Sequence, residues 1–256
     1  MLKTLEELSE MVKTYTPNQN TFRPFKLTFN MMTNICLSHP WISLDGILAH
    51  ILLRKLLGDD FYYLPSSMPI DFFEMVALPL KKYALDDLFI YHGSVSLFER
   101  EKLFIDKIYK RFEDGKMKFM DSGRSTKIDI TRGRFKNYMI NLPYLPIDKI
   151  IFYGNGDIEE IKTLLPYLPG LGKKIAAGFG FFRSFEITQI KKDKSLVNEE
   201  NRAMRPIPCE FLDERKNYEK IVLAYKFPYW AKGNITLCCN INEKITFKPS
   251  VEDSNA

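Results

Sequence analysis

The residues best suited to chemistry lie in one glycine-rich stretch, and the chemistry that they suit is phosphate binding. Residues 168–187 hold two Gly-x-Gly pairs with Lys173 and Lys174 between them. Glycine adopts positive φ values and lets a ligand approach the main chain, and consecutive amides in such a loop form a concave site for phosphate oxygens. The stretch therefore predicts an anion site, the alternative being a ligand-free connection between a helix and a strand. The four glycines are Gly170, Gly172, Gly178 and Gly180.

Two familiar nucleotide-binding fingerprints do not fit this stretch. A P-loop ends in Gly-Lys followed by Ser or Thr, and no such run is present. A Rossmann loop would need glycine where Ile175 stands, and it would follow a strand instead of the helix that we predict before this loop. We therefore predict no cofactor.

A second group of residues combines cations with aromatic side chains. If the segment "RGRFKNY" is a strand, Arg132, Arg134 and Lys136 share one side of it. Phe135 then lies on the other side, and Tyr138 follows Lys136 on the basic side. Cations at alternate positions with interleaved aromatics suit a single-stranded nucleic acid, whose phosphates are paired and whose bases are stacked. The alternative is a solvated, salt-bridged face, but together with the glycine loop this segment favours RNA or single-stranded DNA as the ligand.

Histidines are the candidates for catalysis, because cutting RNA without a metal needs a general base for the 2′-hydroxyl. His39 follows the first predicted strand in "SHPW" and is the candidate base of an alternative reading, a metal-independent endoribonuclease. We expect His50 to be a core or boundary residue of a helix and His92 to be structural. The acidic pairs at 59–60 and 86–87 are typical of turns, and no Ser-His-Asp or metal-ligand spacing is present. We predict a binding protein with no catalytic residue and no metal.

Composition places the chain among folded proteins of the cytoplasm. With 256 residues, of which 45% are hydrophobic, it can bury a core. Its net charge is +5, and residues 102–138 alone hold eleven Lys or Arg against five Asp or Glu. The sequence shows neither a secretory signal nor an apolar run long enough to span a membrane, so we predict no membrane partner. Four cysteines lack metal-binding spacing and are expected to be reduced: Cys36, Cys209, Cys238 and Cys239.

The order of the predicted elements indicates a mixed α+β fold. Strands are predicted over 23–32, 88–98, 148–154 and 181–190, and helices over 44–57 and 157–165. This βαββαβ order fits the ferredoxin-like or RRM-like architecture. The basic residues at about 100–140 would then be an insertion between the second and third strands, which we expect to be partly disordered. A short helix is predicted within residues 1–22, and a further strand within 218–230.

The glycine loop also resembles a known family signature. Gly170-Leu171-Gly172, five residues including lysines, and Gly178-Phe179-Gly180 match the G-hydrophobic-G-x5-G-x-G loop of the RAMP superfamily of CRISPR proteins. The ordered segments "SLDGILAH", "TRGRFKNY", "IIFYGNGDIEEIKTLL", "LGKKIAAGFGFFRSFEI" and "RPIP" resemble the Cas-five-type subunit of type IV CRISPR effector complexes. The resemblance covers residues 23–210. It divides the chain into an N-terminal helical extension (1–22), a RAMP domain (23–210) and a C-terminal extension (211–256) packed on that domain, with its last residues disordered.

The resemblance implies a subunit that grips the 5′ handle of the guide RNA and caps the backbone filament of a ribonucleoprotein. It further implies backbone RAMP subunits, a large subunit and target DNA as partners, with a role in reading the motif beside the DNA target. A third reading is an RRM-like scaffold that binds only proteins, through Trp41 or Trp230. The predicted RNA-binding residues are Gly170, Gly172, Lys173, Lys174, Gly178, Phe179, Gly180, Arg183, Arg124, Lys127, Arg132, Arg134, Phe135, Lys136, Tyr138, His39, Trp41, Arg202 and Arg205.

Overall fold

A computed structural model describes residues 3–65, 68–99, 102–112 and 129–248. Two predicted RNA-binding residues, Arg124 and Lys127, lie outside these ranges. The last residues, for which disorder was predicted, also lie outside them. The side chain of Arg134 is not described either. The helices are α1 (Leu5–Lys13), α2 (Leu44–Leu57), α3 (Ile70–Glu74) and α4 (Ile158–Leu164). The strands are β1 (Arg23–Met31), β2 (Lys82–Leu85), β3 (Leu88–Tyr91), β4 (Phe104–Lys110), β5 (Tyr138–Tyr144), β6 (Lys149–Gly156), β7 (Phe182–Gln189), β8 (Ile207–Pro208), β9 (Lys220–Ala224) and β10 (Ile235–Cys239).

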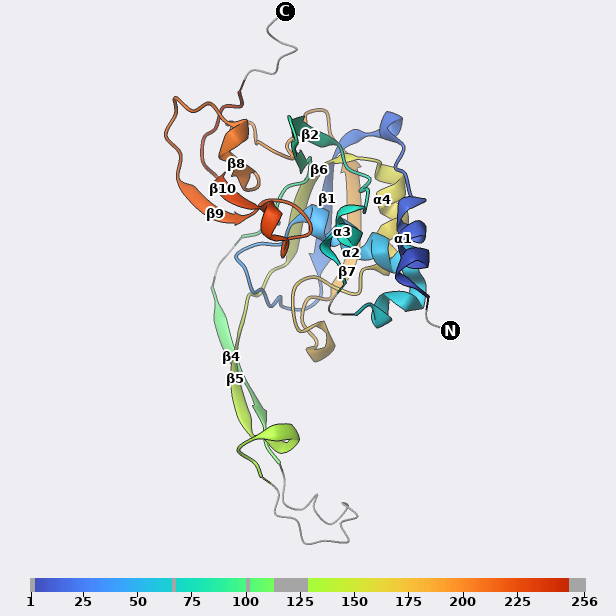
Figure 1. Cartoon of the computed structure of the whole chain (residues 1–256). Helices are drawn as coiled ribbons and strands as arrows, with labels where there is room; N and C mark the ends of the chain where they lie inside the picture. The colour runs from blue at the N-terminus through green and yellow to red at the C-terminus, as the bar shows by residue number, and fades with distance from the viewer. Residues whose placement is uncertain (1–2, 66–67, 100–101, 113–128, 249–256) are drawn as a thin grey trace, which may run out of the picture.

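The centre of the molecule is a three-stranded sheet in the order β6–β1–β7, with both pairings antiparallel. On β1, Phe25, Leu27 and Phe29 alternate with more polar residues and are fully buried. They belong to one hydrophobic core with residues of α2 and α4, which cover a single face of the sheet (Figure 1). The period-two pattern of β1 thus separates a face packed on helices from a polar face.

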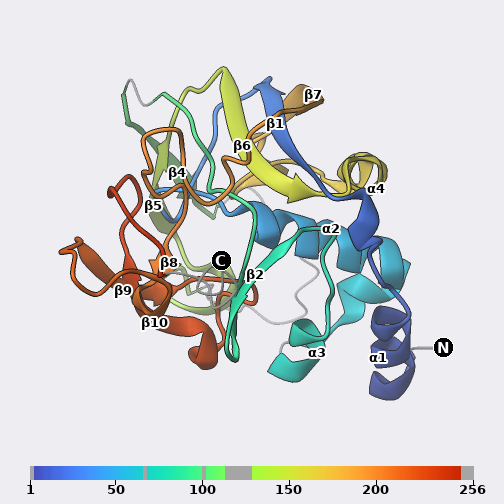
Figure 2. The same ribbon diagram turned by 90° about the horizontal axis from the view of Figure 1, so that it is seen from above.

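Helix α2 forms where the sequence predicts it, because its apolar residues recur at helical spacing. Leu44, Leu48 and Ile51 are fully buried in the main core, and the helix ends at Gly58, whose φ is 56°. Figure 2 shows α2 crossing the sheet, with β8–β10 near its N-terminal end and α1 near its C-terminal end. The predicted N-terminal helix is α1, which has the Thr4/Glu7 capping box and buries Leu8 and Val12.

The strand predicted over residues 88–98 is interrupted. Its first part, β3, pairs with β2, and the Gly93 N–H then donates to the Tyr91 carbonyl at 2.8 Å, which makes a tight turn. Residues 93–97 continue antiparallel along the outer edge of β6, with bridges Gly93↔Gly154 and Leu97↔Ile151. A short backbone turn thus splits one predicted strand into two elements with different partners.

The basic insertion contains a two-stranded hairpin, β4–β5, here called the arm. Its register runs from Phe104↔Tyr144 at the root to Lys110↔Tyr138 at the outer end. Figure 1 shows the arm projecting from the body of the molecule. The strand predicted for "RGRFKNY" is wrong at its start, because residues 133–135 form a turn of 3-10 helix and Gly133 has a φ of 67°. Arg132 and Lys136 therefore do not alternate along a strand.

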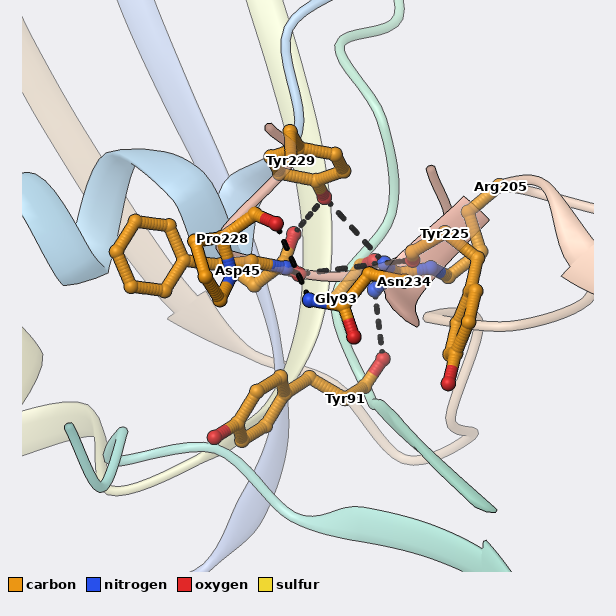
Figure 3. Close-up of polar contacts among 9 residues, drawn as sticks. Asp45, Tyr91, Gly93, Arg205, Tyr225, Pro228, Tyr229 and Asn234 are labelled. Carbon is orange, nitrogen blue, oxygen red and sulfur yellow. Dashed lines mark hydrogen bonds and ion pairs between the residues drawn. The ribbon is translucent and has the colours of Figure 1, made fainter. Parts of the chain in front are cut away.

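Residues 203–247 form a C-terminal lobe around the β8–β10–β9 sheet, and they share a second hydrophobic core with Ile90 of β3 and Leu196. Arg205 ties this lobe to the N-terminal end of α2 (Figure 3). Its guanidinium lies 3.3 Å from the Asp45 carboxylate and donates to the carbonyls of Tyr91 and Gly93 at 2.8 Å, and also to the carbonyl of Tyr225. The prediction that Arg205 is an RNA-contacting surface residue is wrong, because its side chain is only 1% exposed.

Candidate nucleic-acid interface

The glycine loop connects α4 to β7 at the end of the sheet from which the arm projects (Figure 1). Its two ends are joined by the hydrogen bond from Leu171 N–H to the Gly180 carbonyl at 2.8 Å. It is attached to the segment after β1 by bonds from Lys173 N–H to the Cys36 carbonyl, 2.7 Å, and from Gly180 N–H to the Asn34 carbonyl, 2.8 Å. The loop is therefore a fixed feature of the fold.

Three of the loop glycines are required by close packing. A Cβ on Gly180 would overlap the Leu171 carbonyl, and one on Gly172 would lie 2.5 Å from the Cys36 carbonyl oxygen. A Cβ on Gly170 would lie 2.9 Å from the Gly180 oxygen. Gly178 differs, because it has a φ of +95° with open space around it. The sequence predicted glycines that make room for a ligand, whereas most of this room is filled by the protein's own backbone.

The part of the loop that remains available to a ligand is a row of amides at residues 174–176. Lys174 has left-handed backbone angles (φ 61°, ψ 33°) and is followed by a 3-10 turn, η6 (Ile175–Ala177). A left-handed residue followed by a right-handed one makes consecutive N–H groups converge on a concave site for anions. Within the described ranges, the amides of residues 174–176 have no acceptor. We call these three amides the nest.

Two lysines stand at the start of the nest. The side chains of Lys173 and Lys174 are exposed, and neither has a hydrogen bond or an ion pair to any residue that the structure describes. Arg183 is also exposed, at an irregularity where β7 gains one residue relative to β1. Ammonium groups beside amides that have no acceptor in the described part of the chain give this end of the sheet a local positive potential, which favours binding of a phosphate.

An aromatic series connects the loop to the root of the arm. The rings of Phe179 and Tyr144 lie 5.7 Å apart, and those of Tyr144 and Phe104 are stacked, also 5.7 Å apart with an interplanar angle of 16°. The ammonium of Lys102 lies 5.3 Å from the centre of the Phe104 ring. We call Phe179, Tyr144 and Phe104 the aromatic series. Sequence reasoning found only Phe179, because the three residues come from segments far apart in the chain.

Behind the loop lies a cavity of about 750 Å³. It is bounded by the glycine loop, the segment after β1, the first turns of α2, and β9 of the C-terminal lobe. Besides Gly170 and Gly172 of the loop, two other predicted residues line it, Trp41 and His39. His39 also lines a hollow of about 390 Å³ beside the arm's root, where Lys102 and Pro143 lie. The structure thus brings His39 and Trp41 to the same site as the glycine loop.

The remaining predicted residues lie elsewhere or have partners of their own. Arg132 forms an ion pair with Asp129 at 2.6 Å, and Phe135 packs edge-on against Phe112, with ring centres 5.3 Å apart. Lys136 and Tyr138 are exposed at the outer end of the arm, six residues along β5 from its root and so about 20 Å away. Arg202 pairs with Glu200 at 3.0 Å just before the C-terminal lobe begins. These residues do not join the glycine loop in one surface.

None of the histidines has the surroundings of a general base. His39 is exposed and has no hydrogen-bond partner among the described residues. Partial burial of the His50 ring, together with the nearby Arg54, lowers the pKa of His50, which packs edge-on against Phe61 with ring centres 5.2 Å apart. His92 Nδ1 lies 2.9 Å from Asp193 Oδ2 and 3.0 Å from Ser195 Oγ.

Asp193 is held ionised by these neighbours. Burial alone would raise the pKa of its carboxyl, but hydrogen bonds from His92, Ser195 and Asn155 outweigh burial and hold that pKa well below its usual range. Ser195 and Asp193 share one nitrogen of His92, whereas a catalytic triad uses both ring nitrogens. The cluster therefore fixes residues 193–195 against β6 and does not form a nucleophile.

Metal binding, disulfide formation and membrane spanning find little support in the described residues. No group of three or more His, Cys, Asp or Glu side chains in them could hold a metal ion. The four cysteines are all free, and three of them are buried. Within the same residues, every helix is too short or too polar to cross a membrane.

Comparison with known proteins identifies a family. The family described as CRISPR type IV associated protein Csf3 matches residues 23–240. This match confirms the resemblance to a type IV CRISPR family that the glycine loop and the ordered segments indicated. No curated protein matches the chain.

Two solved structures show a weak likeness. One is described as the Type III-B Cmr-beta bound to cognate target RNA, with 11% identity and a TM-score of 0.37; the likeness covers 72% of this chain and spans 65% of that one. The other is the Csm3-Csm4 subcomplex in the type III-A CRISPR-Cas interference complex, with 11% identity and a TM-score of 0.39, covering 91% of this chain and 96% of that one. At these TM-scores the likeness carries no argument about function.

Proposed function

Because the chain belongs to the Csf3 family of CRISPR type IV associated proteins, we propose that it is a non-catalytic RNA-binding subunit of a type IV CRISPR ribonucleoprotein and holds the 5′ handle of the guide RNA. The observation that carries the proposal is the nest: three consecutive amides have no acceptor among the described residues, and the ammonium groups of Lys173 and Lys174, which pair with none of those residues, flank them. A backbone phosphate satisfies both the amides and the cations.

The aromatic series supports a single strand as the form of the ligand. Its rings begin at Phe179, three residues beyond the nest, and continue through Tyr144 to Phe104. A strand with one phosphate in the nest stacks its next bases on these rings, and Lys102 neutralises a further phosphate at the root of the arm. Every base has an aromatic face, so this contact tolerates different handle sequences.

The sheet supports a ferredoxin-like topology. Strands β1, β6 and β7 take the places of the first, third and fourth strands, since β1 lies between the other two and is antiparallel to both. Residues 93–97, antiparallel to the outer edge of β6, take the place of the second strand. The arm is then the insertion between the second and third strands.

The arm also supports a place in a larger assembly, with backbone RAMP subunits as partners. Ile105 is 64% exposed, Tyr109 52% and Met139 51%, all on one face of a two-stranded ribbon. Such a ribbon is marginally stable alone, and large exposed apolar side chains in a group are typical of protein interfaces. Contacts with the large subunit and with target DNA follow from the family resemblance, and we assign no described residue to them.

The test is binding of the purified chain to repeat-derived RNA of the same genome, measured by fluorescence anisotropy at several salt concentrations. Lys173→Gln with Lys174→Gly should weaken binding and lower the slope of log affinity against log salt by about 0.7 for each phosphate contact removed. Lys232→Gln, which changes an exposed lysine of the C-terminal lobe, is the matched control. Unchanged affinity and slope in the double variant would refute the proposal. Metal-free cleavage of the RNA that is lost in His39→Ala would establish the endoribonuclease instead.

A further inference from the structure

The cavity behind the glycine loop has an apolar interior and a polar mouth. Inside, the lining includes Trp41, Ile47, Leu171, Leu223 and the ring of Tyr229. The exposed lining residues that form its mouth include His39 and Gly172, and Ile175 of the nest is also part of the wall. A volume of about 750 Å³ is in the range of small-molecule sites and exceeds what one phosphate group fills.

The polar groups around this interior favour an uncharged ligand. The Tyr229 hydroxyl donates to Asp45 at 2.6 Å and is therefore occupied. The pKa of His50 is lowered, which favours its neutral form and disfavours a cation in the wall. The cations of this region, Lys173 and Lys174, do not line the cavity. A phosphate that entered would lose its hydration without an ion pair, whereas a flat aromatic ring would replace water at an apolar surface.

The position of the cavity relative to the nest indicates which aromatic ring it would bind. Ile175 contributes its amide to the nest and its side chain to the cavity wall, so a strand with a phosphate in the nest has a nucleoside next to the mouth. We propose that the cavity binds one nucleobase, turned out of the RNA strand and stacked on Trp41. This inference rests on the proposed function and adds a base-reading site to it, because a pocket with walls around one base can discriminate between bases where the open aromatic series cannot.

The C-terminal lobe gives the proposal its structural basis. Ile221, Leu223 and Ala224 of β9 form the wall opposite the glycine loop, and Tyr229 follows in the same lobe. Because Arg205 and Tyr229 both contact Asp45 at the start of α2, the distance across the cavity is set by a buried polar network (Figure 3). The pocket is therefore preorganised and can reject a ring that does not fit.

The experiment uses the chain's two tryptophans. Trp230 is 56% exposed, packs on Phe73 and Phe227, and does not line the cavity. Trp230→Phe leaves Trp41 as the single indole, so we expect repeat-derived RNA to quench its fluorescence. In parallel, an abasic residue is moved one position at a time through the 5′ handle. One position should weaken binding about tenfold or more, since stacking on a protein aromatic contributes on that order.

The variants separate this proposal from its alternatives. Trp41→Ala should lose the dependence on that one base while still binding RNA through the nest, and Trp41→Phe should retain it. Equal affinity at every abasic position, or quenching of Trp41 only when a partner protein is added, would overturn the nucleobase proposal. Neither result would contradict phosphate binding by the nest. No binding of intact RNA to the wild-type chain would overturn the proposed function itself. Thermal unfolding of each variant shows whether a loss reflects misfolding.

Discussion

The guanidinium of Arg205 and the carboxylate of Asp45 lie 3.3 Å apart, and their side chains are 1% and 0% exposed. The two residues are 160 positions apart in the chain, one at the start of the C-terminal lobe and the other in the first turn of α2. Charges so completely removed from water must be compensated, and three main-chain carbonyls accept further hydrogen bonds from the two terminal guanidinium nitrogens. The pair holds the lobe against the helix and so closes one side of the cavity.

Arg205→Met should lower the free energy of unfolding by about 3–5 kcal/mol, because it leaves the Asp45 carboxylate buried without a partner. Urea unfolding followed by fluorescence measures this change. Arg202→Met is the matched control: its surface pair with Glu200 is exposed, so about 0–1 kcal/mol is expected. If Arg205→Met were as stable as the wild type and bound RNA more weakly, Arg205 would be a surface contact after all.

Gly180→Ala should destabilise the protein more than Gly178→Ala. A Cβ at 178 meets open space, so only the positive φ opposes it, at roughly 1 kcal/mol. A Cβ at 180 overlaps the Leu171 carbonyl, which adds about 1–3 kcal/mol of overpacking and moves the loop. Unfolding in urea compares the two, and RNA binding should weaken in Gly180→Ala alone. Equal effects of both substitutions would contradict the packing role of Gly180.

Local pattern was enough to predict most of the regular elements. Apolar spacing and flanking caps predicted α2 to its exact ends, alternation predicted β1 and β7 to within one residue, and a short apolar run predicted β6 to within two. These signals are local, since a helix or strand is defined by the face that it buries. The sequence did not predict the break at Gly93 or the turn at Gly133. Each depends on the backbone conformation of a single residue, and the types of the neighbouring residues do not indicate that conformation.

The candidate site was predicted only in part, for a different reason. The loop signature and its lysines are contiguous, so the sequence shows them together. Phe104 and Tyr144 become neighbours of Phe179 only through the pairing of the arm, and Arg205 meets Asp45 only through the docking of the lobe. Arg205 precedes two prolines within three positions, a pattern that indicates a rigid extended turn. Long-range partners decide its burial.

The ionisation of Asp193 should make the free energy of unfolding depend on pH in the acidic range. The pKa of its carboxyl in the folded protein lies below the unfolded value, which is about 3.9. Its contribution to stability is therefore complete above about pH 4 and is lost as the pH falls below that value. Asp193→Asn should be less stable at pH 7 and should lose less stability between pH 4 and pH 3 than the wild type. Urea midpoints at pH 7, 4 and 3 measure this, and parallel curves for the two proteins would show that His92 and Ser195 do not stabilise the carboxylate.

Tyr144→Ala should weaken RNA binding by roughly 5- to 150-fold, the effect of removing one aromatic stacking contact. Tyr144 lies between Phe104 and Phe179, so its loss also interrupts the aromatic series from the loop to the arm. Tyr109→Ala is the matched control on the same hairpin: this residue is 52% exposed and lies near the outer end of the arm, where we expect a protein partner. Anisotropy with repeat-derived RNA compares the affinities of the two variants, and circular dichroism checks that each variant is folded. If Tyr109→Ala reduced affinity as much as Tyr144→Ala, the strand would follow the whole arm, and the outer cations Lys136 and Arg132 would return to the RNA surface.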